Sequence, residues 1–501
     1  MTTTLTNNND NHIFVNFSHF LLKKIVRNLK IVDSIRFTLV SKKWFQERDK
    51  YLLFEDEVQP EDLIYLLSFK KIRFDIDFPQ TRLFIVDEIN DTHYEDNYSQ
   101  YETPDDELTI KRMEGIREVF FEVDNLNIAK YKEILEKSNV QIVSARRIEQ
   151  LTPGSLPSKL KNLDIDDYPF RLESNHLPSS LENLSLLSNN HNPFQISSLP
   201  PNLKSLTFFR VFGEIAFEDI RNVNILPKTL TKIKNCPYQW IKFLKNLPFL
   251  TTLQITENIP NGYLEPGDFP ESLTNLSLQS PIELIESLIP QSIQHLNLPN
   301  CILDLSSNEL PRSSHFQSLC VKDINSPILP NQLPPYIKEL NLIKYNQELV
   351  PGSLPNGIET LKLPTLDAGF LYEGVIPSST KNLHLFEAHS ENPFKASSIP
   401  NAVETLELGS LDSDIDFGMI PNSVCSITCN IGLIKKYGIN SIKSTVNHIK
   451  IIGELNYEFD RIDQNWFFAY YCGYSFIQEK SILNLLEKDK PLVNLQTCQT
   501  Q

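Results

Sequence analysis

The sequence predicts an α/β fold that is mostly β: a solenoid built on a parallel β ribbon of about fourteen coils, with a small helical head before it and a cap after it. Three observations favour this fold. The 501 residues include 32 prolines but only 15 glycines, a balance that indicates a rigid corner used repeatedly. A Leu-Pro or Ile-Pro dipeptide returns about every 22 residues, and apolar residues follow it at constant spacing.

The repeat is clearest where Pro157 is followed by Leu160, Leu163 and Ile165. The same Pro-x-x-Leu-x-x-Leu-x-Leu frame returns at Pro178, Pro200, Pro227, Pro270, Pro290, Pro334, Pro355, Pro377, Pro400 and Pro421. Three further coils are irregular. Leu250 comes one residue early after Pro248, two residues are inserted between Pro311 and Phe316, and the coil at Val446 has no proline.

Each part of the frame has a physical reading. Leu-x-Leu places two apolar side chains on one face of a strand, because side chains alternate along a strand. The first leucine turns inward as the chain enters the strand, and the proline fixes φ and makes a corner. One coil has a single apolar strip, so it needs stacked neighbours to form a continuous core.

The frame resembles the strand signature of leucine-rich repeats and, more closely, the FNIP repeat family. In that family a Phe-Asn-x-Pro-like segment precedes a Leu/Ile-Pro corner. Similar segments occur here at residues 192–194 (Asn-Pro-Phe), 345–347 (Tyr-Asn-Gln) and 392–394 (Asn-Pro-Phe), each ahead of such a corner. The resemblance implies a leucine-rich-repeat-like solenoid over residues 150–452.

The outward residues of the strands predict a binding face, because solenoids use such ladders as extended contact surfaces. They are mostly small and polar, and charge varies most in the later coils. We expect a protein partner to contact eight of them: Glu339, Asn341, Thr360, Lys362, Asn382, His384, Thr405 and Glu407.

Residues 13–54 have apolar positions at near-helical spacing and predict a small helical head. The order of residues resembles an F-box, most specifically at residues 40–44 (Val-Ser-Lys-Lys-Trp), although Phe17 and Ser18 replace the usual Leu-Pro opening. The resemblance implies that the head docks to the Skp adaptor of a cullin-based ubiquitin ligase. The matching residues are Leu21, Leu22, Ile25, Leu29, Asp33, Val40 and Trp44. The alternative is that these residues form the core of a cap on the solenoid.

The remaining segments complete the expected organisation. Residues 1–12 should be disordered, and residues 55–149 should form a linker or divergent first coils, with strands near Leu83 and Val119 and a helix from Ile128 to Lys137. Within them, residues 87–107 carry nine acidic residues and no lysine or arginine, as is typical of a solvated loop. Residues 453–501 are rich in aromatic side chains and should cap the last coil.

The sequence favours binding over chemistry. It contains no phosphate-binding glycine loop, dinucleotide fingerprint, zinc-protease motif or nucleophile elbow, so we expect no enzyme activity, cofactor or metal. The net charge of −16 argues against nucleic acid as a partner. No apolar run approaches membrane-spanning length and no signal peptide is evident. We therefore expect a monomeric cytoplasmic protein, with the nucleus as an alternative, that either recruits substrates to a ligase or acts as a repeat scaffold.

Overall fold

The computed structural model describes most of the repeat region and parts of the segments around it. The described residues are 22, 82–86, 118–122, 127–138, 140–168, 170, 172–187, 196–209, 226–306, 310–345, 347–363, 372–385, 398–409, 417–453, 456–462, 465–469, 475–478, 482 and 486. The chain divides into two compact units: unit 1 comprises Met1–Phe78 and Asp416–Gln501, and unit 2 comprises Pro79–Ile415.

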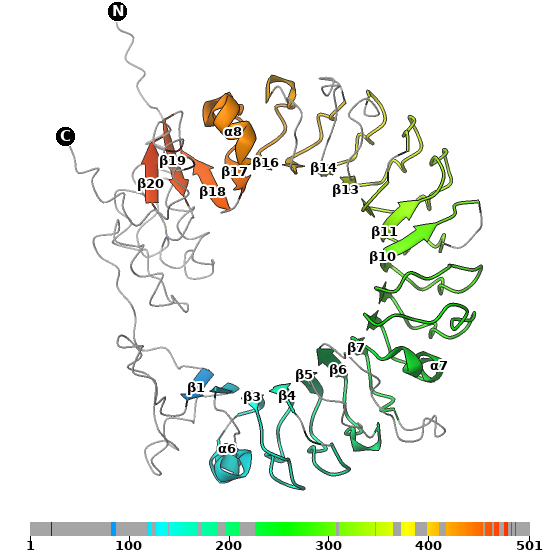
Figure 1. Ribbon diagram of the computed structural model, residues 1–501, viewed down its shortest axis with the longest axis vertical. Coiled ribbons are helices and arrows are strands. Elements are labelled where there is room, and N and C mark those ends of the chain that lie inside the picture. Colours follow the sequence, from blue (N-terminus) through cyan, green and yellow to red (C-terminus); the bar gives the residue numbers. More distant parts are fainter. Residues whose placement is uncertain are drawn as a thin grey trace, which may run out of the picture. The chain divides into compact units, whose positions relative to one another are not determined.

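Unit 2 is a parallel β solenoid in which each strand pairs with the next strand of the sequence (Figure 1). Its strands are β1 (Arg82–Val86), β2 (Glu118–Glu122), β3 (Ile142–Arg147), β4 (Asn162–Asp167), β5 (Asn183–Leu187), β6 (Ser205–Phe209), β7 (Lys232–Lys234), β8 (Thr252–Ile255), β9 (Asn275–Leu278), β10 (His295–Leu303), β11 (Ser318–Ile324), β12 (Glu339–Leu342), β13 (Thr360–Leu363), β14 (Asn382–Leu385) and β15 (Thr405–Leu408). Within this unit the strands line the inner side of the curve, and the return segments lie on the outer side (Figure 1).

Helical segments are few and short in the described part of unit 2. They are η6 (Ile128–Tyr131), α6 (Lys132–Lys137), η7 (Ile196–Ser198), η8 (Tyr238–Trp240) and α7 (Ile241–Leu244). The strands expected near Leu83 and Val119 are present as β1 and β2, and the helix expected from Ile128 to Lys137 is present as η6 and α6.

Unit 1 combines two parallel strands with an antiparallel extension. Strands β16 (Ser426–Asn430) and β17 (His448–Ile452) are parallel, whereas β18 (Tyr457–Arg461), β19 (Trp466–Ala469) and β20 (Ser475–Gln478) continue antiparallel from β17. Its helical segments are η10 (Phe417–Met419), α8 (Ile431–Tyr437) and η11 (Ile439–Ser441). The aromatic side chains of Tyr457, Phe459 and Phe467 are buried, so the aromatic tail contributes to the core of this unit.

The core of unit 2 is formed by three aligned apolar columns, one from each inward position of the frame. At the position three residues after the corner proline, Leu160, Leu181 and Leu203 have no exposed surface, and the two strand positions alternate with partly exposed neighbours. Thr380 occupies the first inward position of one coil, where a leucine was expected, and is also fully buried. Its Oγ1 lies 3.5 Å from the carbonyl oxygen of Ile358, which satisfies the hydroxyl in this apolar column.

The Pro-x-x-Leu spacing is explained by a hydrogen-bonded turn. The N–H of the inward residue donates to the carbonyl of the proline three residues earlier, at 3.0–3.3 Å. In unit 2 this bond forms at Pro157, Pro178, Pro200, Pro227, Pro270, Pro290, Pro355, Pro377 and Pro400. The irregular coils keep the turn without a proline acceptor: Leu250 donates to Leu247, Phe316 to Ser313 and, in unit 1, Val446 to Lys443.

A second turn lies on the return side of the coils and was not predicted from the sequence. In the coil before β13, the N–H of Ser353 donates to the carbonyl of Val350 at 3.0 Å, and Gly352 has a φ of +84°. Pro351 supplies the fixed φ that such a turn favours at its second residue. The third turn residue also has positive φ at Gly154, Asn175, Gly267, Ser287, Asn331 and Gly374.

Neighbouring coils are joined by a shared carbonyl just before each strand. The carbonyl oxygen of Lys161 accepts two N–H groups from the next coil, those of Glu182 at 2.8 Å and Asn183 at 2.9 Å. In unit 2 the same pair of hydrogen bonds, at 2.7–3.1 Å, is accepted by the carbonyls of Gln141, Glu182, Lys204, Thr231, Thr251, Thr274, Gln294, Gln317, Lys338, Glu359 and Lys381. It fixes the register of each strand on the one before it.

The structure confirms the predicted mostly β parallel solenoid, but the solenoid of unit 2 has fewer coils than the number expected. About fourteen were expected between residues 150 and 452. The solenoid of unit 2 has twelve strands in that range, β4–β15, and the last two expected coils correspond to β16 and β17 of unit 1. The predicted frame therefore continues past the end of unit 2.

Two glycines of one coil test the return-side turn. We expect Gly352→Ala to destabilise the protein by about 1 kcal/mol, because an L-residue at this φ is strained although no atom lies within 4 Å of the added Cβ. Gly357→Ala is the matched control: its φ is not in this region and its Cβ would make ordinary contacts of 3.7 and 3.9 Å. Thermal unfolding measures both variants, and equal melting temperatures would contradict the role assigned to the turn.

Candidate functional site

The eight residues expected to bind a partner lie together on strands β12–β15 of unit 2. They form two columns that cross the strands. The first column is Glu339, Thr360, Asn382 and Thr405, and the second is Asn341, Lys362, His384 and Glu407. All face away from the buried leucines, because they alternate with them along each strand. We call this set of eight residues the ladder.

The first column offers an exposed carboxylate and a run of hydrogen-bonding groups. Glu339 is exposed, and Thr360, Asn382 and Thr405 are partly exposed. The Nδ2 of Asn382 donates to Oγ1 of Thr360 at 3.2 Å, which links β14 to β13 through side chains. These groups remain near the surface, where an incoming backbone or side chain could exchange hydrogen bonds with them.

The second column is more heavily charged. Asn341 donates from Nδ2 to Sγ of Cys320 on β11 at 3.3 Å, and Nδ1 of His384 contacts Oε2 of Glu407 on the next strand. Lys362 lies between Asn341 and His384 in register. A cation, an imidazole and a carboxylate therefore follow one another on three adjacent strands.

The imidazole of His384 is held toward its neutral form. Burial lowers its pKa below 6.5, and the positive charge of Lys362 acts in the same direction, whereas Glu407 opposes the shift. Only 17% of the side-chain surface is exposed, so burial has the larger effect. The ladder thus contains a titratable group whose charge depends on its surroundings near neutral pH.

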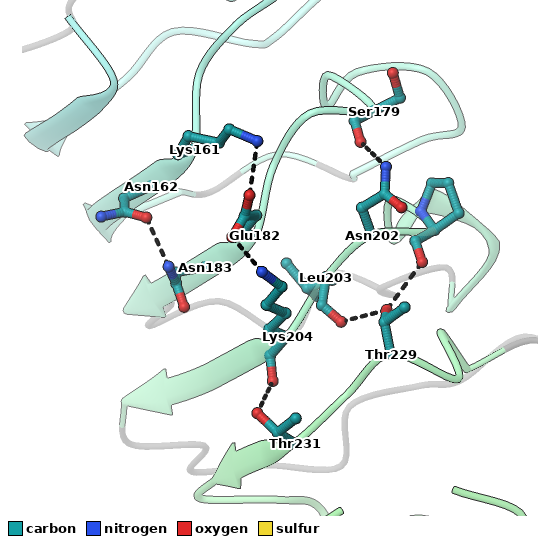
Figure 2. Close-up of polar contacts among 11 residues, drawn as sticks. Lys161, Asn162, Ser179, Glu182, Asn183, Asn202, Leu203, Lys204, Thr229 and Thr231 are labelled. Atoms are coloured by element: carbon teal, nitrogen blue, oxygen red, sulfur yellow. Dashed lines mark hydrogen bonds and ion pairs between the residues drawn. The ribbon is translucent and has the colours of Figure 1, made fainter. Parts of the chain in front are cut away.

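A third column, just before the strands, was missed by the sequence analysis. Glu182 lies between two lysines of neighbouring coils, with its Oε1 2.6 Å from Nζ of Lys161 and its Oε2 2.7 Å from Nζ of Lys204 (Figure 2). These contacts hold the pKa of Glu182 at about 2. The arrangement returns where Glu359 lies 3.5 Å from Lys338 and 3.3 Å from Lys381.

The signal for this column was present in the repeat spacing. Lysine, glutamate and lysine occupy the same position of three successive coils in both places, one residue before the strand. Between them the position is held by Thr231, Thr251, Thr274, Gln294 and Gln317. The three threonine hydroxyls each donate at 3.1 Å to the carbonyl of the same position in the preceding coil. Aligning the repeats one residue further upstream would have shown both patterns.

A second missed feature is a hydroxyl before the first inward residue. In Figure 2, Oγ1 of Thr229 donates to the carbonyl of Leu203 at 2.7 Å. Ser180, Ser272, Ser292 and Ser379 make the equivalent bond to the preceding coil, at 2.6–2.8 Å. The sequence signal is a serine or threonine two residues after the corner proline. These hydroxyls satisfy carbonyl groups at the corners, which makes their role structural.

Of the residues expected to bind a ligase adaptor, the structure describes one. Leu22 is helical and 1% exposed. The others, Leu21, Ile25, Leu29, Asp33, Val40 and Trp44, lie outside the described residues. Docking of this segment therefore stays a prediction.

Two features bear on whether the described residues could carry out chemistry: metal-binding groups and the thiol of Cys429. Among the described residues, no group of three or more histidine, cysteine, aspartate or glutamate side chains could hold a metal ion. Cys429 has no exposed surface, and burial raises the pKa of its thiol to about 12, so it is no nucleophile at neutral pH. Over the same residues, no helix has the length and apolarity needed to cross a bilayer.

Comparison with known families identifies the repeat. The FNIP repeat model matches residues 149–188, 171–210, 325–366 and 389–429. These stretches carry FNIP repeats. The second pair of matches includes most of the ladder, with strands β12, β13 and β15 inside the matched residues. The chain is a repeat protein, and these repeats include its parallel β strands.

Solved structures similar to this chain include the circular leucine-rich-repeat protein CroV588 and InlP of Listeria monocytogenes. CroV588 is 17% identical, with a TM-score of 0.30 over 68% of this chain and 67% of that chain. InlP is 16% identical, with a TM-score of 0.22 over 66% of this chain and 68% of that chain. No curated protein matches the chain.

The contact between His384 and Glu407 gives a pH-dependent prediction. The pKa of His384 in the folded chain is below its unfolded value of 6.5, so the unfolded chain binds more protons as the pH falls through 6.5. We expect His384→Asn to reduce the loss of stability in that window. Glu407→Gln should enlarge the loss, because it removes the group that raises this pKa. Melting temperatures between about pH 7.5 and 5.5 measure both, and parallel curves for all three proteins would contradict the assignment.

Proposed function

We propose that the chain is a non-enzymatic protein-interaction module and that the ladder on β12–β15 contacts its partner. The observation that carries the proposal is the register of the ladder. It brings eight polar and charged side chains from four coils onto one continuous face. Successive strands are about 4.8 Å apart, so the four strands provide contact points over roughly 14 Å. A folded protein or an extended segment can span that distance.

The repeat architecture supports this proposal. Stacked coils bury the apolar side of every strand and leave the other side open, which is how solenoids present extended binding surfaces. The ladder has no large aromatic side chain to anchor a partner. Its hydrogen bonds and charges would therefore contribute more to the choice of partner than to the strength of binding. The proposed location is the cytoplasm or the nucleus.

A finer proposal concerns the helical head. The F-box-like order of residues 13–54 supports docking to a Skp adaptor, with the repeats holding a substrate of the ligase. The alternative is a repeat scaffold whose head only caps the solenoid. The two functions share the same ladder and differ in whether residues 13–54 bind another protein.

Charges added to the ladder test the binding face. We expect Thr360→Glu with Thr405→Glu to weaken partner capture by the purified full chain by at least about tenfold, because both new carboxylates lie in the contact face. Asn356→Glu with Ser378→Glu is the matched control, since it adds the same charge at exposed corners of neighbouring coils. Quantitative affinity capture compares the three proteins. Equal capture by all of them would exclude the ladder as the site.

The adaptor proposal has its own test. The intact chain should co-precipitate the Skp adaptor, and Leu29→Glu with Val40→Asp should abolish recovery by placing charges in the apolar surface of the F-box-like segment. Circular dichroism must show that the variant keeps its fold. No recovery by the intact chain would leave the repeat scaffold as the function.

A further inference from the structure

Strand β7 carries two lysines on the side of the strand that faces away from the core of unit 2. Lys232 and Lys234 lie on either side of Ile233, which is fully buried, so both lysine side chains are on the solvent side of the strand. Both are partly exposed. Only Ile233 lies between them, so they are two residue steps apart and about 6.8 Å from each other along the strand.

The neighbouring strands surround this pair with neutral polar groups. Lys232 is paired in register with Ser205 on β6 and Thr252 on β8, and Lys234 with Thr207 on β6. One strand further out, β5 contributes Asn183 and Ser185, and β9 contributes Asn275 and Ser277. The outward positions next to the two lysines therefore offer hydroxyls and amides but no charge.

No carboxylate of the described residues neutralises the pair. The carboxylate of Glu182, two strands away, is held between Lys161 and Lys204. Glu257, beyond the end of β8, accepts the backbone N–H of Tyr238 at 3.1 Å. Within the described structure, two like charges thus lie side by side in a chain whose net charge is −16. The two ammonium groups repel each other, and an anion bound against them offsets that repulsion.

We propose that Lys232 and Lys234 bind an extended acidic segment of a protein partner whose carboxylates stand at alternate positions. An extended peptide places residues i and i+2 on one side with a repeat of about 6.8 Å, which matches the spacing of the two lysines. The hydroxyls and amides of the neighbouring strands donate hydrogen bonds to carboxylate and backbone oxygens. The inference rests on the proposed protein-binding function and adds a second contact point and the charge of the partner.

The surroundings of the pair argue against a nucleic acid as the occupant. A polyanion needs basic groups spread along its track, but the outward strand positions of β8 and β9 carry no lysine or arginine. The basic residues of this face, Lys232 and Lys234, lie on the single strand β7. It fits a short acidic stretch within an otherwise neutral segment.

The test uses the full chain and a capped synthetic peptide, Gly-Ser-Glu-Thr-Glu-Ser-Gly, whose carboxylates are activated with a carbodiimide. A carboxylate close to a lysine then forms an amide with it, and mass spectrometry locates the bond. We expect cross-links at Lys232 and Lys234. Lys232→Gln with Lys234→Gln should lower the total yield about tenfold, because both ion pairs are lost.

Two controls isolate the site. Lys228→Gln with Lys245→Gln removes two charges from exposed positions of the same coil outside the strand and should leave the yield unchanged. A peptide with adjacent glutamates, Gly-Ser-Glu-Glu-Thr-Ser-Gly, directs its carboxylates to opposite sides when extended and should react several-fold less at the pair. Equal yields with both peptides, or cross-links spread evenly over surface lysines, would overturn the proposal.

Competition and capture separate the remaining outcomes. Much stronger protection of the pair by a phosphoserine peptide of equal length than by the Glu-Thr-Glu peptide would show that the site prefers phosphate and overturn the acidic-segment assignment. A partner that is lost by the ladder variant but fully retained by Lys232→Gln with Lys234→Gln would also overturn it, while the proposed binding function would stand. Loss by both variants supports the two contact points together.

Discussion

The carbonyl that precedes each strand is the contact on which the solenoid depends. It accepts two N–H groups from the following coil, so each coil enters its strand at a position set by its neighbour. That constraint aligns the inward leucines into buried columns and, by alternation, aligns the outward residues into the ladder. Coils of 20 to 27 residues share this entry point, for example from Lys232 to Thr252 and from Ser205 to Lys232. The length of a coil can therefore vary only between the end of its strand and the entry point of the next strand.

Each coil is closed by two turns, one at each of its corners. The proline-side turn delivers the first inward residue to the core, and it survives where its proline is displaced or missing, as at Leu250 and Val446. The return-side turn depends on a residue with positive φ, as at Gly352. A hydrogen bond closes both corners, and the second corner also needs a residue with positive φ.

The sequence predicted the frame because burial repeats with the same spacing in every coil. Leu160 and its counterparts were identified from period alone, and the outward position of the ladder followed from alternation. The return-side turn was missed because its third residue varies, as Asn331 and Ser287 show. The bridges at Glu182 and Glu359 depend on which side chains adjacent coils bring together, which period alone does not specify. The roles of residues 13–54 and of the ladder stay predictions, since a binding face is defined by its partner as much as by its own residues.

The lysine–glutamate–lysine columns have a consequence for how such an array can change in length. Removing the single coil that carries Glu182 would place Lys161 beside Lys204, and removing the one that carries Glu359 would place Lys338 beside Lys381. Each loss would turn two attractions into one repulsion. Removing such a coil together with one adjacent lysine coil creates no lysine–lysine contact within that column. Within these columns, gain or loss of coils by recombination should therefore be tolerated better in pairs than singly. The threonine coils carry no charge at this position, so they impose no such requirement for an even number.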